Sequence, residues 1–165
     1  MFSVGDHIIY GSSGVCRVEA IGPVNISGVS GNRLYYTLKP VFSKSSTVFT
    51  PVDNDKVVMR PLISKKQAKE LVKRLRDVDV LWISNDKKRE EIYKESMRKC
   101  DIEEWARMIK TLYLRQQQRL AEGKQATASD ERYYKMAQDN LYGELSVVLG
   151  IEKAKMDDYI RGHFE

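Results

Sequence analysis

Hydrophobic residues fall into short clusters over the first 61 positions, and polar and glycine-containing turns separate these clusters. The clusters are rich in β-branched and aromatic residues, which is typical of strands. The predicted strands cover 6–10, 14–21, 33–39, 46–50 and 56–59. Two segments that begin and end with glycine, 11–14 and 28–31, supply turns because glycine tolerates positive φ. Short strands this closely spaced favour a small β-barrel.

The pattern becomes helical from Ser64 onward. Ser64 and Gln67 form a capping-box pair, and apolar residues follow with the i, i+3, i+4, i+7 spacing of one helix face. These apolar residues are Ala68, Leu71, Val72 and Leu75. The change of pattern after Pro61 predicts a two-domain α+β chain, with a β domain over 1–62 and a helical domain over 63–165.

Capping residues mark three further helices in the second half. A second helix starts at Ser84 or Asn85, and a third starts at Asp101, which pairs with Glu104 as a capping box. A fourth starts at Thr127 or Ser129. Gly123 and Gly150 are expected to end the third and fourth, and an amphipathic tail covers 152–160. The second domain is therefore predicted to be an all-α bundle of about five helices.

The composition is that of a globular protein, with 42% hydrophobic and 31% charged residues in 165. No apolar stretch reaches the roughly 18 residues that span a bilayer, and residues 1–10 lack the basic start of a signal peptide. Cys16 and Cys100 lie far apart, without the spacing of a zinc site or a disulfide framework. We expect a cytoplasmic protein that makes no membrane contact.

The net charge of +5 is concentrated directly after the domain boundary, where residues 61–100 carry twelve Lys or Arg and seven Asp or Glu. Lys65, Lys69 and Lys73 share one face of the first helix, as phosphate-neutralising lysines would. The alternative is a solvated helix face with alternating charges, and charge alone favours that alternative.

Catalytic residues that could converge are scarce. His7 and His163 lie near opposite ends of the chain, and neither has metal-ligand spacing. No nucleotide-binding motif occurs, and the glycine segments fit turns better than phosphate loops because no helix or Lys-Ser/Thr pair follows them. The sequence therefore favours a binding protein over an enzyme, with no metal, cofactor or small-molecule substrate expected.

The two tryptophans have different settings. Trp105 belongs to the apolar stripe of the third helix and is expected in the core. Trp82 lies between two basic helices, where an exposed indole would stack on a base or enter a minor groove. Core packing at a helix junction is the commoner role of such a residue, and the residues alone favour it. Both interpretations stay open for Trp82.

An ordered series of motifs resembles the CarD/CdnL family of bacterial transcription regulators. The series begins with the stretches 2–10 and 14–21 and continues with 35–38, 47–51 and 58–61. It ends with Ala137 and the stretch 141–145, Leu-Tyr-Gly-Glu-Leu. This resemblance implies a Tudor- or SH3-like N-terminal barrel, similar to the RNA polymerase-interacting domain of the transcription-repair coupling factor.

The resemblance implies that the N-terminal domain docks on the β subunit of RNA polymerase by strand addition. The expected docking residues lie on two strands of the predicted barrel. They are Arg33, Tyr35, Tyr36, Val48, Phe49 and Thr50. Phe49 stands where many relatives have a basic or aliphatic residue, a difference that concerns the details of the contact and not its mode.

For the helical domain, the resemblance implies largely sequence-independent contact with promoter DNA and an effect on open-complex stability. The expected DNA-binding residues are Trp82, Lys87, Lys88, Arg89 and Lys94. Relatives commonly carry a wedge tryptophan before the second helix, where this chain has Asp86, and Trp82 is a candidate to replace it. A protein–protein adaptor that makes no DNA contact is the alternative.

Overall fold

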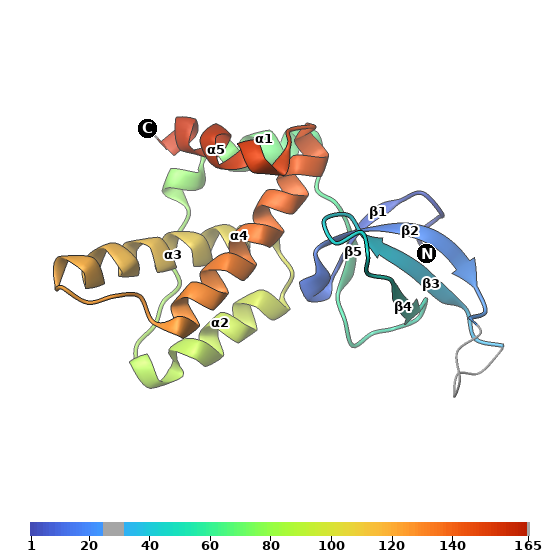
Figure 1. Ribbon diagram of the computed structural model, residues 1–165, viewed down its shortest axis with the longest axis horizontal. Coiled ribbons are helices and arrows are strands. Elements are labelled where there is room, and N and C mark those ends of the chain that lie inside the picture. Colours follow the sequence, from blue (N-terminus) through green and yellow to red (C-terminus); the bar gives the residue numbers. More distant parts are fainter. Residues whose placement is uncertain (25–31, 165) are drawn as a thin grey trace. The chain divides into compact units, whose positions relative to one another are not determined.

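The N-terminal part of the chain forms one antiparallel sheet in the computed structural model, which describes residues 1–24 and 32–164 (Figure 1). The predicted turn at 28–31 lies outside the described residues. The strand order is β4-β3-β2-β1-β5. The strands are β1 (His7–Tyr10), β2 (Val15–Gly22), β3 (Tyr35–Pro40), β4 (Val48–Pro51) and β5 (Met59–Pro61). They fall close to the predicted positions, with ends shifted by a few residues.

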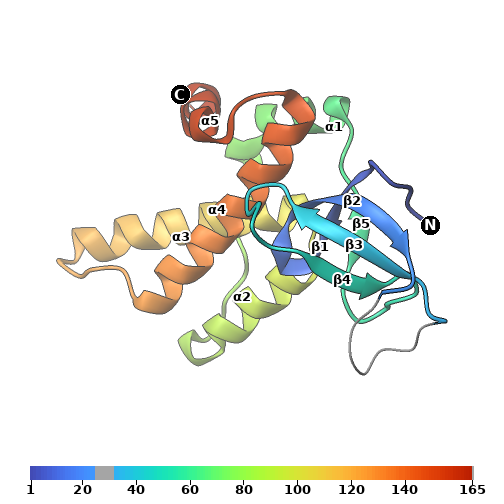
Figure 2. The ribbon, with the colours of Figure 1, turned by 45° about the vertical axis from the view of Figure 1, so that its right-hand side comes forward.

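The predicted barrel is not closed. Within 1–24 and 32–164 no pairing joins β4 to β5, so these two strands are the edges of an open sheet (Figure 2). Both edge strands are short and both end in a proline, Pro51 or Pro61, which has no backbone N–H to donate to a neighbouring strand. The unit Met1–Leu62 is therefore an open sheet, and together with the helices that follow it confirms the predicted α+β class of the chain.

Alternating side chains build the core of this sheet. In β3, Tyr36 and Leu38 are buried while their neighbours are half-exposed, as expected for a strand with one face covered. They pack with Ile8, Cys16 and Val18. One face of the sheet therefore packs into the core, and the residues on the other face are accessible to solvent.

Gly11 starts the 3₁₀ turn Gly11–Ser13 between β1 and β2, with φ at 47°. A Cβ atom at this position would lie 2.7 Å from Cγ1 of Val57. The backbone N–H of Gly11 donates to the carbonyl of Val58, which explains the close approach. The turn predicted at 11–14 therefore needs glycine for both its conformation and its packing.

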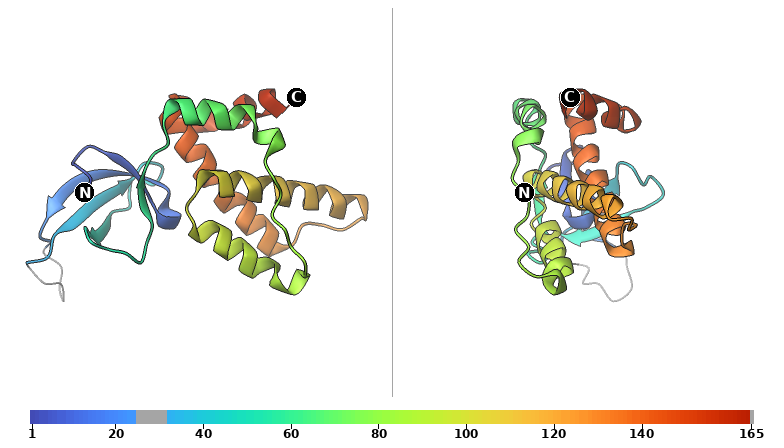
Figure 3. Two further views of the ribbon diagram at one scale, coloured as in Figure 1. Left: turned by 180° about the vertical axis from the view of Figure 1, so that it is seen from behind. Right: turned by 90° about the vertical axis from the view of Figure 1, so that its left-hand side faces the viewer.

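The second unit, Ile63–Glu165, is helical (Figure 3). Its longer helices, α3 (Ile102–Ala121) and α4 (Ala128–Leu149), pack along each other, and α2 (Arg89–Arg98) packs on both. The helices α1 (Lys65–Lys73) and α5 (Met156–Phe164) lie beside one another and contact α4. Trp105, Tyr93, Met108, Leu145 and Met156 are buried, so the core position predicted for Trp105 is confirmed.

The helix starts follow the predicted caps with one correction. Asn85 caps a 3₁₀ turn, η3 (Asp86–Lys88), which leads directly into α2, and Thr127 caps α4. Gly150 ends α4 in the left-handed region. Asp101 caps α3 through the backbone N–H of Glu103, but Glu104 does not complete the predicted box. The carboxylate of Glu104 is bound instead by Ser96 and Arg107.

The capping box of α1 is confirmed. The Ser64 hydroxyl accepts from the backbone N–H of Gln67 at 3.1 Å, and the Gln67 side chain accepts from the backbone N–H of Ser64 at 2.9 Å. We expect Ser64→Ala to lower the free energy of unfolding by about 1 kcal/mol, because the substitution leaves an N–H of the first turn without its partner. Urea titration measures this, with the exposed neighbour Lys66→Ala as control. Equal losses in the two variants would contradict it.

No helix in the described part of the chain combines the length and apolar character that crossing a bilayer requires. Two further 3₁₀ turns complete the second unit, η2 (Leu75–Asp77) after α1 and η4 (Lys153–Lys155) before α5. Between η2 and η3 the chain runs without regular structure over 78–85, which includes Trp82. Side chains of α3 hold this segment in position through hydrogen bonds to its backbone.

Candidate functional site

The outer edge of β4 presents backbone groups that no other strand in residues 1–24 and 32–164 covers. β3 and β4 are antiparallel, with Thr37 opposite Phe49 and Tyr36 opposite Thr50. Beyond β4, Val52 N–H donates to the carbonyl of Leu34 at 3.1 Å. Hydrogen-bonded pairs alternate along an antiparallel ladder, so Thr50 and Val48 face β3 while the N–H and C=O of Phe49 face outward. This edge can therefore accept a further strand.

The six predicted docking residues divide into two groups. Tyr36 and Thr50 are each 1% exposed. The Tyr36 hydroxyl accepts from the backbone N–H of Phe2, and the Thr50 hydroxyl accepts from the Asn54 amide. Their side chains therefore serve the interior of the sheet and are out of reach of a partner.

The other four docking residues reach the surface. Phe49 is 44% exposed, so its ring is accessible to a partner. Arg33 is exposed and its guanidinium pairs with Asp53 at 3.2 Å. Val48 and Tyr35 are half-buried. The exposed phenylalanine and the outward backbone of the same residue make Phe49 the centre of this edge.

The segment that carries Trp82 is fastened to α3 by side chains that bind its backbone. Lys110 donates to the carbonyls of Arg76 and Val78, at 2.6 and 2.7 Å. The Thr111 hydroxyl accepts from the backbone N–H of Leu81 at 2.8 Å. Leu81 is buried beneath the segment. These contacts give an irregular stretch a fixed path, so the direction of Trp82 is set in advance.

Trp82 is 81% exposed, so the interpretation that it packs in the core is wrong. The reason is local, because Val78 and Leu81 fill the buried positions of the segment and leave Trp82 outward. Among the other predicted DNA-binding residues, Lys87, Lys88 and Lys94 are exposed. The three lysines of the α1 stripe are exposed as well. These cations and the indole are available to a polyanionic partner.

Arg89 differs from these lysines because its guanidinium is engaged within the protein. Its Nε and Nη2 atoms donate to Oδ1 of Asp86 at 3.2 and 2.8 Å, and Nη1 donates to the Tyr93 hydroxyl at 3.1 Å. Only 19% of the Arg89 side chain is exposed. The structure therefore does not offer Arg89 to a partner while Asp86 occupies it.

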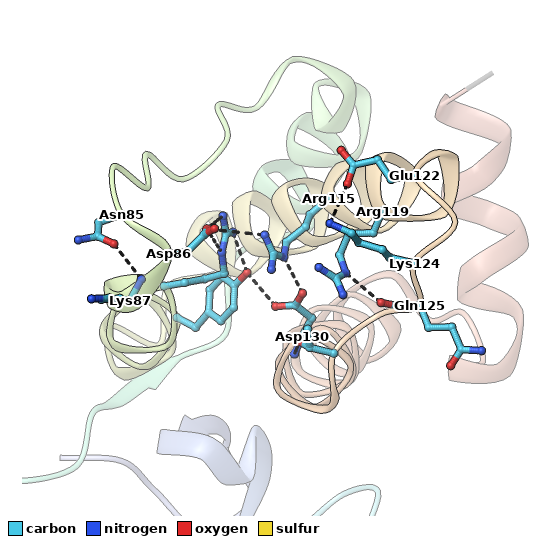
Figure 4. Close-up of polar contacts among 12 residues, drawn as sticks. Asn85, Asp86, Lys87, Arg115, Arg119, Glu122, Lys124, Gln125 and Asp130 are labelled. Atoms are coloured by element: carbon cyan, nitrogen blue, oxygen red, sulfur yellow. Dashed lines mark hydrogen bonds and ion pairs between the residues drawn. The ribbon is translucent and has the colours of Figure 1, made fainter.

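Arg115 of α3 extends this network to α4 (Figure 4). It lies between two carboxylates, with Nε 2.7 Å from Oδ2 of Asp130 and Nη1 3.8 Å from Oδ1 of Asp86. Asp130 is buried and also accepts from the Tyr93 hydroxyl. The pKa of Asp86 is lowered, first by its hydrogen bond and charge pairing with Arg89 and then by Arg115 and Arg119. Asp86 is therefore ionised at neutral pH.

Arg115 was not among the residues predicted from the sequence, and the stretch 116–119 was expected on the solvent side of α3. Arg115 and Arg119 stand one helical turn apart, and Arg119 fixes the following loop through the Gln125 carbonyl at 2.9 Å. Lys124 lies in the same loop, and it is exposed. The available signal was the i, i+4 arginine pair, but its relation to Asp86 requires the tertiary packing of α2 on α3.

No other chemistry emerges from the described residues. Within them, no cluster of three His, Cys, Asp or Glu side chains is arranged for a metal ion. Cys16 is buried, and burial raises the pKa of its thiol to about 11. This thiol is therefore protonated at neutral pH, the form that is a poor nucleophile.

An open strand edge on the sheet, and an exposed indole and exposed lysines on the helical unit, are features typical of proteins that bind macromolecules. Two family models match the chain: the CarD-like/TRCF RID domain over residues 2–63, and the CarD C-terminal domain over residues 70–161. The chain belongs to the CarD-like family, whose domains are associated with transcription regulation and RNA polymerase interaction.

Proposed function

We propose that this protein regulates transcription initiation by docking on the β subunit of RNA polymerase through its sheet and contacting promoter DNA through its helices. Family membership across both halves of the chain carries this proposal. The free edge of β4 supports the first contact, because strand addition needs an outward backbone and Phe49 has one. We assign Arg33, Tyr35, Val48 and Phe49 to this contact. Residues 1–62 are the proposed polymerase-interacting domain.

The helical unit supports the second contact through charge. Exposed Lys87, Lys88 and Lys94 follow the exposed Trp82 in sequence, and Arg119 adds positive charge near Asp86. Lysine–phosphate contacts are largely independent of base sequence, and an indole stacks on any base. We infer that the DNA contact modulates the lifetime of the open promoter complex without selecting a particular sequence.

The polymerase contact is tested with Phe49→Asp. A carboxylate at the outward residue of β4 repels the carbonyls of an incoming strand and removes the aromatic contact, so we expect at least about tenfold weaker binding to polymerase, or roughly 1.4 kcal/mol. Surface-immobilised full-length protein titrated with purified bacterial RNA polymerase measures the affinity. Phe42→Asp is the matched control, because Phe42 is 45% exposed and lies outside the strands.

Equal losses in the two phenylalanine variants would contradict docking by β4.

The DNA contact is tested separately by titrating the full chain with a duplex at several salt concentrations. Phosphate neutralisation predicts that the affinity falls steeply between about 50 and 200 mM salt. Absence of duplex binding, with polymerase binding retained, would favour the adaptor alternative.

A further inference from the structure

One carboxylate oxygen of Asp86 contacts the guanidinium groups of two arginines, Arg89 and Arg115. Oδ1 of Asp86 accepts from Nε and Nη2 of Arg89, at 3.2 and 2.8 Å, and lies 3.8 Å from Nη1 of Arg115. Nε and Nη2 of Arg89 converge on one oxygen of this anion, and the same two donors of an arginine bind phosphate as well as carboxylate. The protein thus presents a formed anion site in which its own side chain sits.

The two carboxylates of this network are not equivalent. Asp130 is buried, accepts from Tyr93 and Arg115, and is held by the N-terminal turn of α4. The side chain of Asp86 is 78% exposed and lies in the single turn of η3. The exposed Asp86 carboxylate is rehydrated when it moves away, so the cost of its departure falls on Arg89 alone, whereas moving Asp130 would leave buried donors without an acceptor. Asp86 is therefore the replaceable anion.

The charges show what remains when Asp86 leaves. Arg115 keeps its ion pair with Asp130 at 2.7 Å. Arg89 keeps only the uncharged Tyr93 hydroxyl, because Asp86 is its sole carboxylate partner within the described residues. An unpaired, partly buried guanidinium is the strongest available driving force for taking up another anion. The neighbouring cations Lys87 and Lys88 are exposed.

We infer that Arg89 and Arg115 form a binding site for one phosphodiester group of a nucleic-acid backbone, and that Asp86 occupies this site in the free protein. This inference rests on the proposed function and adds a competing internal anion to it. Each binding event exchanges Asp86 for a phosphate, so Asp86 limits the affinity of the DNA contact. The alternative is that Asp86 only stabilises the start of α2 and orients Arg89.

The test measures duplex affinity of the full-length protein by fluorescence anisotropy at several salt concentrations. Asp86→Asn keeps the size of the side chain and removes its charge. We expect up to about eightfold tighter binding at 0.1 M salt and a salt slope steeper by about 0.9, as for one added phosphate contact. Asp158→Asn is the matched control, because Asp158 is an exposed aspartate in the first turn of α5 and gives the same net charge.

A second substitution identifies the group that takes up the phosphate. Adding Arg89→Gln to Asp86→Asn is expected to remove the gain and return the salt slope to that of the unmodified protein. Asp86→Ser is expected to reproduce the gain of Asp86→Asn, which keeps the test independent of one variant's folding. The vacated guanidinium of Asp86→Asn is expected to take up inorganic phosphate as well, so its melting temperature should be slightly higher in phosphate than in chloride at equal ionic strength. A rise in phosphate without tighter duplex binding would overturn the assignment to a backbone phosphate in favour of a free anion.

The remaining outcomes separate the inference from the proposed function. Equal affinities of Asp86→Asn and Asp158→Asn would overturn the inference and leave the DNA contact standing. Weaker binding by Asp86→Asn and Asp86→Ser would also overturn it, because Asp86 would then be a positioning residue. Failure of every variant and of the unmodified protein to bind the duplex would overturn the proposed DNA contact, and the inference with it.

Discussion

Replacing Asp130 by alanine is expected to lower the free energy of unfolding by about 3 kcal/mol. The Asp130 carboxylate accepts from Arg115 at 2.7 Å and from the Tyr93 hydroxyl at 3.1 Å. Its removal leaves the partly buried Arg115 guanidinium and the buried Tyr93 hydroxyl without this acceptor. The free-energy cost of these unpaired groups exceeds the net stabilisation that the intact ion pair provides. Urea or thermal unfolding of the full-length protein measures the loss.

Glu131→Ala is the control for this prediction. Glu131 is the next residue in the same first turn of α4 and is exposed, so its removal changes the helix-end charge by the same amount. We expect a change within about 0.5 kcal/mol for this variant. If both variants lose the same small amount, the Arg115–Asp130–Tyr93 network does not join α2, α3 and α4 as the contacts indicate. Asp130→Asn should fall between the two, because the amide oxygen still accepts hydrogen bonds.

Local signals in the sequence were sufficient for most of the secondary structure. The Ser64 and Gln67 side chains, the Thr127 cap and Gly150 each act within a few residues, so their roles follow from short-range geometry. Closure of the barrel is the part of the predicted fold that the described residues do not show, because closure depends on whether two distant short edges meet. Nothing local in β4 or β5 indicates whether they meet, because a proline at the end of a strand is compatible with both an edge strand and a turn.

The sequence predicted those site residues whose exposure follows from their charge. It did not predict the residues whose side chains are turned inward or engaged by tertiary contacts. Lys87, Lys88 and Lys94 are exposed as a basic helix start requires. Arg89 was predicted to bind DNA because arginine is a common phosphate ligand. In the structure its guanidinium is instead bound to Asp86 and Tyr93. The side chains of Tyr36 and Thr50 were assigned to a docking surface by resemblance, and the alternation of β3 and β4 turns them inward.

One helix links the site to the rest of the helical unit. α3 supplies Lys110 and Thr111 to the backbone of the Trp82 segment, and one to two turns further on it supplies Arg115 to the Asp86 cluster. An irregular segment of 78–85 would sample many conformations without these contacts, and ordering it on binding would oppose affinity. Because α3 holds this segment in place, the entropic cost of ordering it is met when the protein folds and does not weaken binding.

Trp82→Ala is expected to shorten the lifetime of the protein–promoter–polymerase complex by about tenfold, because stacking on an aromatic side chain contributes roughly 1–3 kcal/mol per base. The same substitution should leave the free energy of unfolding within about 0.5 kcal/mol of its original value, because 81% of the side chain is exposed and makes few contacts. Trp82→Phe keeps an aromatic face and should retain part of the lifetime. The lifetime is measured after a heparin challenge of preformed open complexes.

Val80→Ala is the matched control for Trp82, since Val80 is an exposed apolar residue of the same segment, 44% exposed. If Trp82→Ala and Val80→Ala both leave the lifetime unchanged while Lys88→Ala shortens it, the contact consists of phosphate neutralisation alone. If Lys110→Met shortens the lifetime while Trp82 is intact, the fixed path of 78–85 itself contributes, because that substitution releases the carbonyls of Arg76 and Val78 without touching the indole. The two results together separate what Trp82 contacts from how α3 presents it.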